Sequence, residues 1–205
     1  MRVYAESNFV LEIVLEQEQH LACEELINLA LGGSIELAVP AFATLEPHGT
    51  IVRREVEGDR LRKELALRMR EVQRTASMAA DASRLRDASE LLIRAEHNAS
   101  KRFLEVRARL LDAARIIALD GAALRAAAAL VDEFGLKLPD AVMLASVLAD
   151  ATARPSPSLF LNRNTKDFYD PGIVARLGET RCEFVGSFDG GLARVRKMLE
   201  TTSAG

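Results

Sequence analysis

The chain has 205 residues, of which 49% are hydrophobic, and its formal net charge is −3. This length and apolar content suffice to bury the core of one domain, and no apolar run approaches the roughly 18 residues that a membrane-spanning helix needs. A signal peptide is not expected, because no basic segment precedes a long apolar stretch at the N-terminus.

The first third of the chain alternates short apolar strands with helices. The periodicity predicts a strand at Arg2–Ala5, a helix carrying the apolar residues Phe9–Val14, a helix at His20–Leu31 and a strand at Ile35–Val39. Gly32-Gly33 is typical of the end of a helix.

Residues 53–120 differ in pattern and in charge from the flanking sequence. Apolar stripes at helical spacing, with neither Gly nor Pro from 59 to 120, predict a hairpin of two long helices over 55–118 with a break near 77–83. The segment carries 16 Lys+Arg against 12 Asp+Glu, a balance of +4, whereas the rest of the chain has a balance of −7. A solvated, salt-bridged helical surface is the simplest interpretation of this composition.

The C-terminal part returns to short elements. An Ala-rich helix is predicted up to Phe134 with Gly135 as its cap, and a second helix within "LPDAVMLASVLAD". Further predictions are a strand at Leu159–Leu161, a polar turn in "NRNTKDFYDPG", a strand at Cys182–Val185 and a helix at Leu192–Leu199. Alternating strands and helices favour an α/β sandwich with a short parallel sheet. We expect one domain over 1–200, with the helical insertion at about 53–120 and a flexible tail at 201–205.

Four carboxylates from distant parts of the chain fall near the predicted strand ends. Glu6 follows the first strand, Glu46 lies about two turns into the helix after the second, Asp140 opens a helix, and Asp167 follows the third strand. Sites in open parallel sheets form outside the carboxyl ends of the strands, so these acids should converge. Crowded carboxylates resist ionisation unless a cation is present, and Mg²⁺ and Mn²⁺ prefer oxygen ligands. The pattern predicts phosphodiester hydrolysis with Mg or Mn as cofactor.

In this interpretation Glu6, Asp140 and Asp167 are the metal ligands and Glu46 supports them. Each acid has a simpler alternative role. Glu6 could be a helix cap and Glu46 a surface acid. Asp140 could be a favourable charge in the first turn of a helix and Asp167 a turn residue.

Further polar residues lie beside the acids in sequence. Asn8, Asn164 and Asp170 are candidate supporting residues that orient the acids, with Asx-turns or a cap as alternatives. Lys166 and Arg163 are candidate phosphate contacts or surface charges. His48 is best interpreted as a structural or surface histidine because no second histidine stands at metal-binding spacing.

The segments that carry these acids resemble a known family. "VYAESNFV" resembles the first strand of a PIN domain, "LPDAVMLAS" its third acidic motif, and "FLNRNTKDF" the segment written T-x-N-x-x-D-F, while Glu46 falls where the second acid is expected. The resemblance covers 1–50 and 120–200. It implies a PIN-like three-layer α/β/α fold and a Mg²⁺- or Mn²⁺-dependent ribonuclease. Because many members, including the VapC-type toxins, belong to toxin–antitoxin pairs, it also implies an antitoxin protein as partner.

Two features depart from the family pattern. The first acid is Glu6 where the family usually has Asp, and the extra methylene moves the carboxylate oxygens outward. In addition, residues 53–120 are far longer than the corresponding helices of the compact toxins.

Three hypotheses follow. The first is an endoribonuclease in which basic residues of the insertion, Arg60, Arg62 and Lys63, bind the RNA substrate. The second is a catalytically weak or inactive PIN-like scaffold that binds RNA or protein. The third is a helical interaction module that forms a homodimer through the Ala-rich hairpin.

Cysteine and aromatic content add two minor expectations. Cys23 and Cys182 form no metal-binding motif and are expected to be reduced thiols in a cytoplasmic protein, with a disulfide as the alternative. The absence of Trp and the 5% aromatic content argue against an aromatic base-stacking platform.

Overall fold

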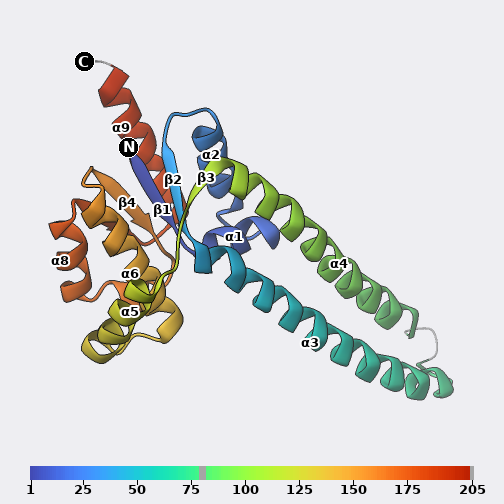
Figure 1. Cartoon of the computed structure of the whole chain (residues 1–205). Helices are drawn as coiled ribbons and strands as arrows, with labels where there is room; N and C mark the ends of the chain where they lie inside the picture. Colours follow the sequence, from blue (N-terminus) through green and yellow to red (C-terminus); the bar gives the residue numbers. More distant parts are fainter. Residues whose placement is uncertain (79–81, 204–205) are drawn as a thin grey trace. The chain divides into compact units, whose positions relative to one another are not determined.

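The structure, a computed structural model, describes residues 1–78 and 82–203. These residues form two compact units, one made of 1–47 with 106–205 and the other of 48–105. The first unit contains the sheet, and the second contains most of a helical hairpin (Figure 1). No described helix is long and apolar enough to cross a membrane.

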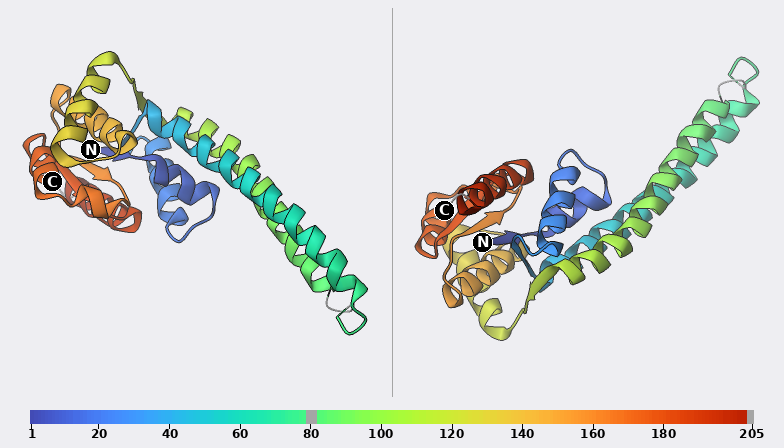
Figure 2. Two further views of the ribbon diagram at one scale, coloured as in Figure 1. Left: turned by 90° about the horizontal axis from the view of Figure 1, so that it is seen from below. Right: turned by 90° about the horizontal axis from the view of Figure 1, so that it is seen from above.

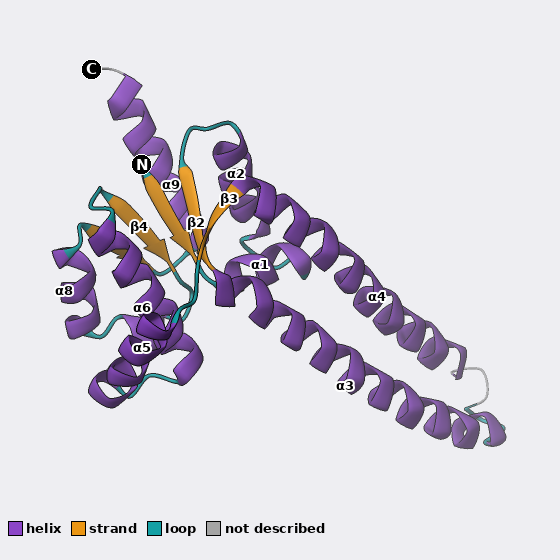
Figure 3. Ribbon diagram, in the orientation of Figure 1, coloured by secondary structure: helices purple, strands orange, loops and turns teal. Residues whose placement is uncertain are grey.

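The first unit is built on a parallel sheet of five short strands in the order β3-β2-β1-β4-β5 (Figure 3). The strands are β1 (Arg2–Ala5), β2 (Glu36–Pro40), β3 (Ala114–Ile117), β4 (Ser158–Leu161) and β5 (Cys182–Val185). The chain adds strands on one side of β1 and then on the other, so the strand order reverses between β1 and β4. Ligand sites in open α/β sheets form at such a switch point, outside the carboxyl ends of the strands.

Helices cover both faces of this sheet, as Figures 1 and 2 show. Their bounds are α1 (Ser7–Val14), α2 (His20–Leu31), α5 (Gly121–Phe134), α6 (Leu138–Ala153), α7 (Thr165–Phe168), α8 (Pro171–Glu179) and α9 (Phe188–Ser203). On one face, Tyr4 and Phe160 are buried in a core cluster with side chains of α5, α6 and α8. On the other, α2 packs with α1 and α9. The predicted α/β sandwich with a parallel sheet is confirmed.

The second unit consists of two long helices that run side by side (Figure 2). They belong to α3 (Ala41–Arg74) and α4 (Ala82–Ala113). Within the unit, Ile51 and Phe103 are buried, and the ring of His48 stacks on Phe103 with centroids 5.7 Å apart, which confirms the structural interpretation of that histidine. Burial decreases along the pair, because Leu61 is 44% and Leu92 42% exposed. The predicted break at 77–83 includes 79–81, which lie outside the described residues.

Two predicted boundaries are wrong. The second long helix ends at Ala113, and the residues after it form β3, which pairs with β2 from Leu37↔Ala114 to Pro40↔Ile117. The apolar pattern of 110–117 continues the helical spacing, so only the pairing partner reveals the strand. The segment interpreted as a polar turn continues into α8, whose N-terminus is capped by Asp170.

Smaller features follow the sequence more closely. α2 has the predicted bounds His20–Leu31. Gly135 ends α5 with φ of 65°, a left-handed conformation that glycine adopts without steric cost. Cys23 and Cys182 are free and buried. The last helix is an exception, since it runs from Phe188 to Ser203 instead of Leu192–Leu199 and includes the first three residues of the predicted flexible tail.

Candidate active site

Glu6 stands at the carboxyl end of β1 and caps α1. The residue is only 5% exposed, and its Oε2 accepts a hydrogen bond of 2.7 Å from the backbone N–H of Asn8. Burial raises the pKa of Glu6 from its ordinary value of 4.5 to about 7, and the charge of Glu46 contributes to the rise, although hydrogen bonds from Asn8 and Arg163 oppose it. Glu6 therefore does cap α1, as the simpler alternative had it. It is also buried beside a second acid, Glu46.

Glu46 reaches the same place from the second turn of α3. The hydroxyl of Ser7 donates to Oε2 of Glu46, and Ser7 directly follows Glu6 at the end of β1. This contact joins residues 39 positions apart. The sequence prediction that these two acids lie together is supported by this contact.

Asp140 lies in the first turn of α6 and is half-buried. Burial raises its pKa, and repulsion from Asp167 raises it further, whereas a hydrogen bond from Asn164 and the charge of Lys137 lower it. Asp167 is therefore close enough to Asp140 for its charge to disfavour the ionisation of Asp140.

The loop after β4 holds the fourth acid. The side-chain oxygen of Asn162, which is 2% exposed, accepts a 2.8 Å hydrogen bond from the backbone N–H of Asn164. The amide of Asn164 donates to Oδ2 of Asp167 at 2.9 Å and also bonds to Asp140. Asn164 thus bridges the second pair of acids, as expected for a supporting residue.

The four acids therefore form two pairs, Glu6 with Glu46 and Asp140 with Asp167. Residues 163 and 164 connect the pairs, since the N–H of Arg163 approaches Oε1 of Glu6 at 3.5 Å. Among residues 1–78 and 82–203, no ion pair joins any of the four to a basic side chain.

The chemistry of these donors suits a hard divalent cation, because all are carboxylate oxygens with amide support. The described part of the chain contains no group of three or more His, Cys, Asp or Glu side chains already arranged to hold a metal ion. The donor types thus fit Mg²⁺ or Mn²⁺, and the two pairs would have to close around the ion.

The remaining supporting candidates differ from one another. Asn8 bonds to Glu6 through both its backbone and its side chain. Asp170 is exposed and its Oδ1 accepts from the N–H groups of Gly172 at 2.8 Å and Ile173 at 3.3 Å. These contacts of Asp170 are those of a helix cap, the alternative that the sequence had left open.

The candidate RNA-binding residues lie on α3 within the hairpin unit. Arg60 and Lys63 are exposed. Arg62 donates a 2.6 Å hydrogen bond to Asp59, three residues earlier on the same helix, so part of its charge is neutralised locally. Their role in RNA binding stays a prediction.

Sequence reasoning missed a buried ion pair next to the acids. Glu12 on α1 is completely buried and pairs with the guanidinium of Arg163, while its Oε2 accepts 2.9 Å from the N–H of Gln19. Arg163 is therefore engaged in an ion pair with a buried acid, although its own side chain is 34% exposed. The available signal was an acid within the apolar run "FVLEIV" of an amphipathic helix.

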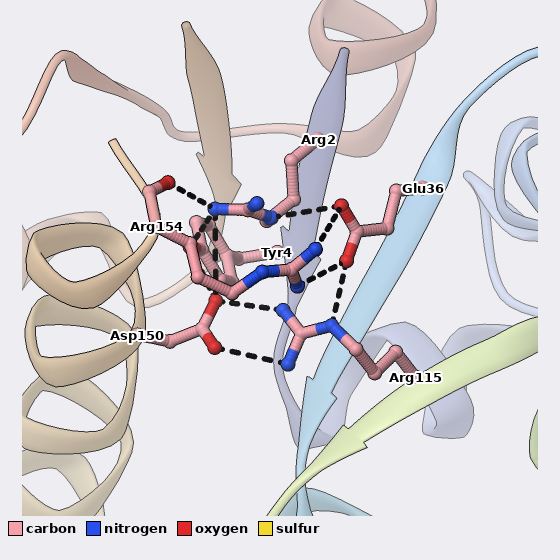
Figure 4. A network of polar contacts seen from close by, with 6 residues as sticks. All are labelled: Arg2, Tyr4, Glu36, Arg115, Asp150 and Arg154. Atoms are coloured by element: carbon pink, nitrogen blue, oxygen red, sulfur yellow. Dashed lines mark hydrogen bonds and ion pairs between the residues drawn. The ribbon is translucent and has the colours of Figure 1, made fainter. Parts of the chain in front are cut away.

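Charged residues also gather at the opposite, amino end of the sheet, where they are fully paired (Figure 4). The network comprises three arginines, two acids and one tyrosine: Arg2, Tyr4, Glu36, Arg115, Asp150 and Arg154. Arg115 makes a bidentate contact with Asp150 at 2.9 and 2.7 Å. Burial alone would raise the pKa of Glu36, but hydrogen bonds from the three arginines lower it to about 2.

The architecture and this site define the class of the protein as α/β, with a five-stranded parallel sheet, helices on both faces and a long helical hairpin. The sequence matches no family model and no curated protein. Among solved structures, the chain is similar to a chain of the crystal structure of VapBC2 from Rickettsia felis bound to a DNA fragment from their promoter. The match has a TM-score of 0.44 and 12% sequence identity, and it covers 90% of this chain and 99% of that chain. A similarity at this level carries no functional argument, so the proposal below rests on the residues of this chain.

Proposed function

We propose that this protein is a metal-dependent endoribonuclease that hydrolyses RNA phosphodiester bonds at Glu6, Glu46, Asp140 and Asp167, with Mg²⁺ or Mn²⁺ as cofactor. The observation that carries the proposal is the accumulation of uncompensated negative charge at the carboxyl end of the sheet. The pKa values of Glu6 and Asp140 are raised by burial and by the neighbouring acids, and buried acids with raised pKa values are characteristic of functional sites.

Each residue of the site has a proposed role that its contacts support. Glu6, Asp140 and Asp167 would hold the cation, which when bound supplies charge neutralisation at the phosphate and favours attack by water. Ser7 fixes the carboxylate of Glu46 next to Glu6. Asn164 orients Asp167 and Asp140 together.

An assay of RNA cleavage tests the proposal. Purified protein is incubated with end-labelled single-stranded RNA and Mn²⁺, Mg²⁺ or a chelator, and cleavage should occur only with a metal ion. Asp140→Asn should slow cleavage by about 100-fold, the size typical for loss of one electrostatic group in a site. Asp132→Asn, an exposed acid on α5, is the matched control and should retain activity. Unchanged cleavage by Asp140→Asn would refute the site.

A catalytically inactive scaffold that binds RNA or protein is the second candidate. It is favoured by the lack, among the described residues, of a ready-made group of three metal ligands. Calorimetric titration with Mn²⁺ separates the two candidates. Binding that is lost in Asp140→Asn supports the nuclease, and absence of binding by the native protein supports the scaffold.

A role as the toxin of a toxin–antitoxin pair follows only from the resemblance of the acidic motifs to the PIN family. Its test is expression of the native chain and of Asp140→Asn in a bacterial host. Growth arrest by the native chain alone, relieved by the product of a small neighbouring reading frame, is the expected result for a toxin with an antitoxin partner.

A further inference from the structure

Tyr169 is an exposed aromatic residue whose ring packs against a partly buried phenylalanine, Phe184. It is 60% exposed and directly follows α7, where its N–H donates to the carbonyl oxygen of Thr165 at 3.1 Å. Its ring meets Phe184 edge to face, with centroids 5.0 Å apart and planes at 85°. An aromatic side chain that is immobilised before binding loses little entropy when a ligand covers it.

The support behind Tyr169 is a cluster of three further rings. Phe160 of β4 contacts Phe168 and Phe184 edge to face at 5.6 and 6.1 Å, and Phe168 stacks on Phe184 at 6.0 Å. Phe160 and Phe168 are fully buried and Phe184 is partly buried. Tyr169 is therefore the exposed member of an aromatic cluster anchored in the core.

The tyrosine also lies at the same end of the sheet as the acids. A Cβ atom on Gly186 would lie 2.6 Å from the Thr165 methyl group and 3.0 Å from the Tyr169 hydroxyl, so the phenol rests against the residue that follows β5. Glu6 follows β1 and Asp167 lies just after β4, and the sheet order places β4 between β1 and β5. The ring is thus one strand further along the row of strand ends that carries the acids.

We propose that Tyr169 is a stacking platform for one unpaired base of a single-stranded nucleic acid whose phosphate lies at the acids. The inference rests on the proposed function and names the substrate as single-stranded. Base–aromatic stacking tolerates any sequence, because every base has a π face, and it changes affinity by about 5- to 150-fold per base. The composition argued against an aromatic base-stacking platform, and the proposal departs from that expectation because Tyr169 is exposed and supported by Phe184, Phe160 and Phe168.

The test measures binding in the absence of cleavage. Asp140→Asn protein with a chelator is titrated with a seven-nucleotide RNA and with an abasic oligonucleotide of the same length and charge. The RNA should bind about ten-fold more tightly than the abasic chain. Adding Tyr169→Ala should remove this difference, and Tyr169→Phe should retain it. Val174→Ala, which removes an exposed apolar side chain of α8, is the matched control and should leave the ratio unchanged.

Tyrosine emission gives a second readout. The chain has no Trp and two Tyr, and the other, Tyr4, is completely buried and bonded to Asp150. The RNA should quench the emission of Tyr169, whereas the abasic chain should not. An equal loss of affinity for both oligonucleotides in Tyr169→Ala, or no base-dependent binding by the parent, would overturn the inference.

The two proposals fail in different ways. If native protein cleaves RNA and Tyr169→Ala leaves both KM and the base-to-abasic ratio unchanged, the platform is wrong and the nuclease stands. If base-dependent binding is found without cleavage, the platform stands and the nuclease is wrong. A deoxyribose version of the oligonucleotide should show the same base dependence, because stacking does not read the 2′-hydroxyl.

Discussion

Glutamate side chains at the two ends of the sheet have pKa values that are shifted in opposite directions. Glu36 opens β2 at the amino end, and hydrogen bonds from arginines overcome the effect of its burial and bring its pKa to about 2. Glu6 follows β1 at the carboxyl end, where burial and a second acid bring its pKa to about 7. Asp150 and Asp140 repeat the contrast, with pKa values shifted downward and upward.

The difference lies in the partners, since burial opposes ionisation at both ends. At the amino end each carboxylate accepts hydrogen bonds from guanidinium groups (Figure 4), and the charges stabilise the fold. At the carboxyl end the acids face one another, which destabilises the fold unless a cation binds. The unpaired acids mark the carboxyl end of the sheet as a candidate functional site, whereas the paired acids of the amino end have a structural role.

The largest effect is expected from the buried pair beside the candidate site. Arg163→Gln leaves the carboxylate of Glu12, whose side chain is 1% exposed, without its partner. The free energy of unfolding should fall by about 4 kcal/mol, as for other broken buried pairs. Urea denaturation measures the change.

Removal of both partners sharpens that test. The double variant Glu12→Gln with Arg163→Gln should recover much of the loss, because no unpaired charge remains. Arg125→Gln, an exposed arginine on α5, is the control and should be nearly neutral. A double variant as unstable as the single one would show that packing, rather than charge, dominates.

The network at the amino end should be the next most sensitive. Arg115→Gln removes the bidentate partner of Asp150, whose side chain is 9% exposed, and one of the donors to Glu36. We expect a loss of about 3 kcal/mol in the free energy of unfolding, moderated by the remaining contacts of Arg2. The shift of the urea midpoint at pH 7 measures this loss in the free energy of unfolding. A change below about 0.5 kcal/mol, typical of surface sites, would contradict the stabilising role of the charges at the amino end.

Neutralisation of Glu6 should raise the free energy of unfolding, in contrast to the arginine substitutions above. Because the folded-state pKa is raised from 4.5 to about 7, the native state binds more protons in this window and stability falls as pH rises through it. Glu6→Gln should therefore stabilise the protein by about 3 kcal/mol at pH 8 and by little at pH 4. Glu36→Gln is the matched substitution and should destabilise at both pH 7 and pH 8. Equal signs for the two variants would contradict the comparison.

The smallest effect concerns acid unfolding. Since the folded-state pKa of Glu36 is lowered from 4.5 to about 2, its contribution is complete above about pH 4.5 and is lost as pH falls toward 2. The side chain is 32% exposed, so after solvent screening we expect about 1 kcal/mol. Native protein should lose this amount between about pH 5 and pH 2 in thermal or urea unfolding, and Glu36→Gln should not.

Local patterns of the sequence determined the elements and the positions of the acids along them. Short, mainly apolar runs such as Arg2–Ala5 and Cys182–Val185 are strands in the structure. An acid that directly follows an element, as Glu6 does, or opens one, as Asp140 does, keeps that place. These features depend on a few neighbouring residues, so periodicity and caps suffice to predict them.

Only the tertiary structure decided which charges meet. Arg154 bonds to Glu36 across 118 positions, and Arg163 to Glu12 across 151. β3 exists because 114–117 pairs with β2, although its own sequence continues the helical pattern. A pKa of about 2 or about 7 for a glutamate likewise depends on groups brought from distant segments. The chain fixes the order of the residues, whereas burial and charge pairing arise from contacts between segments that no local pattern encodes.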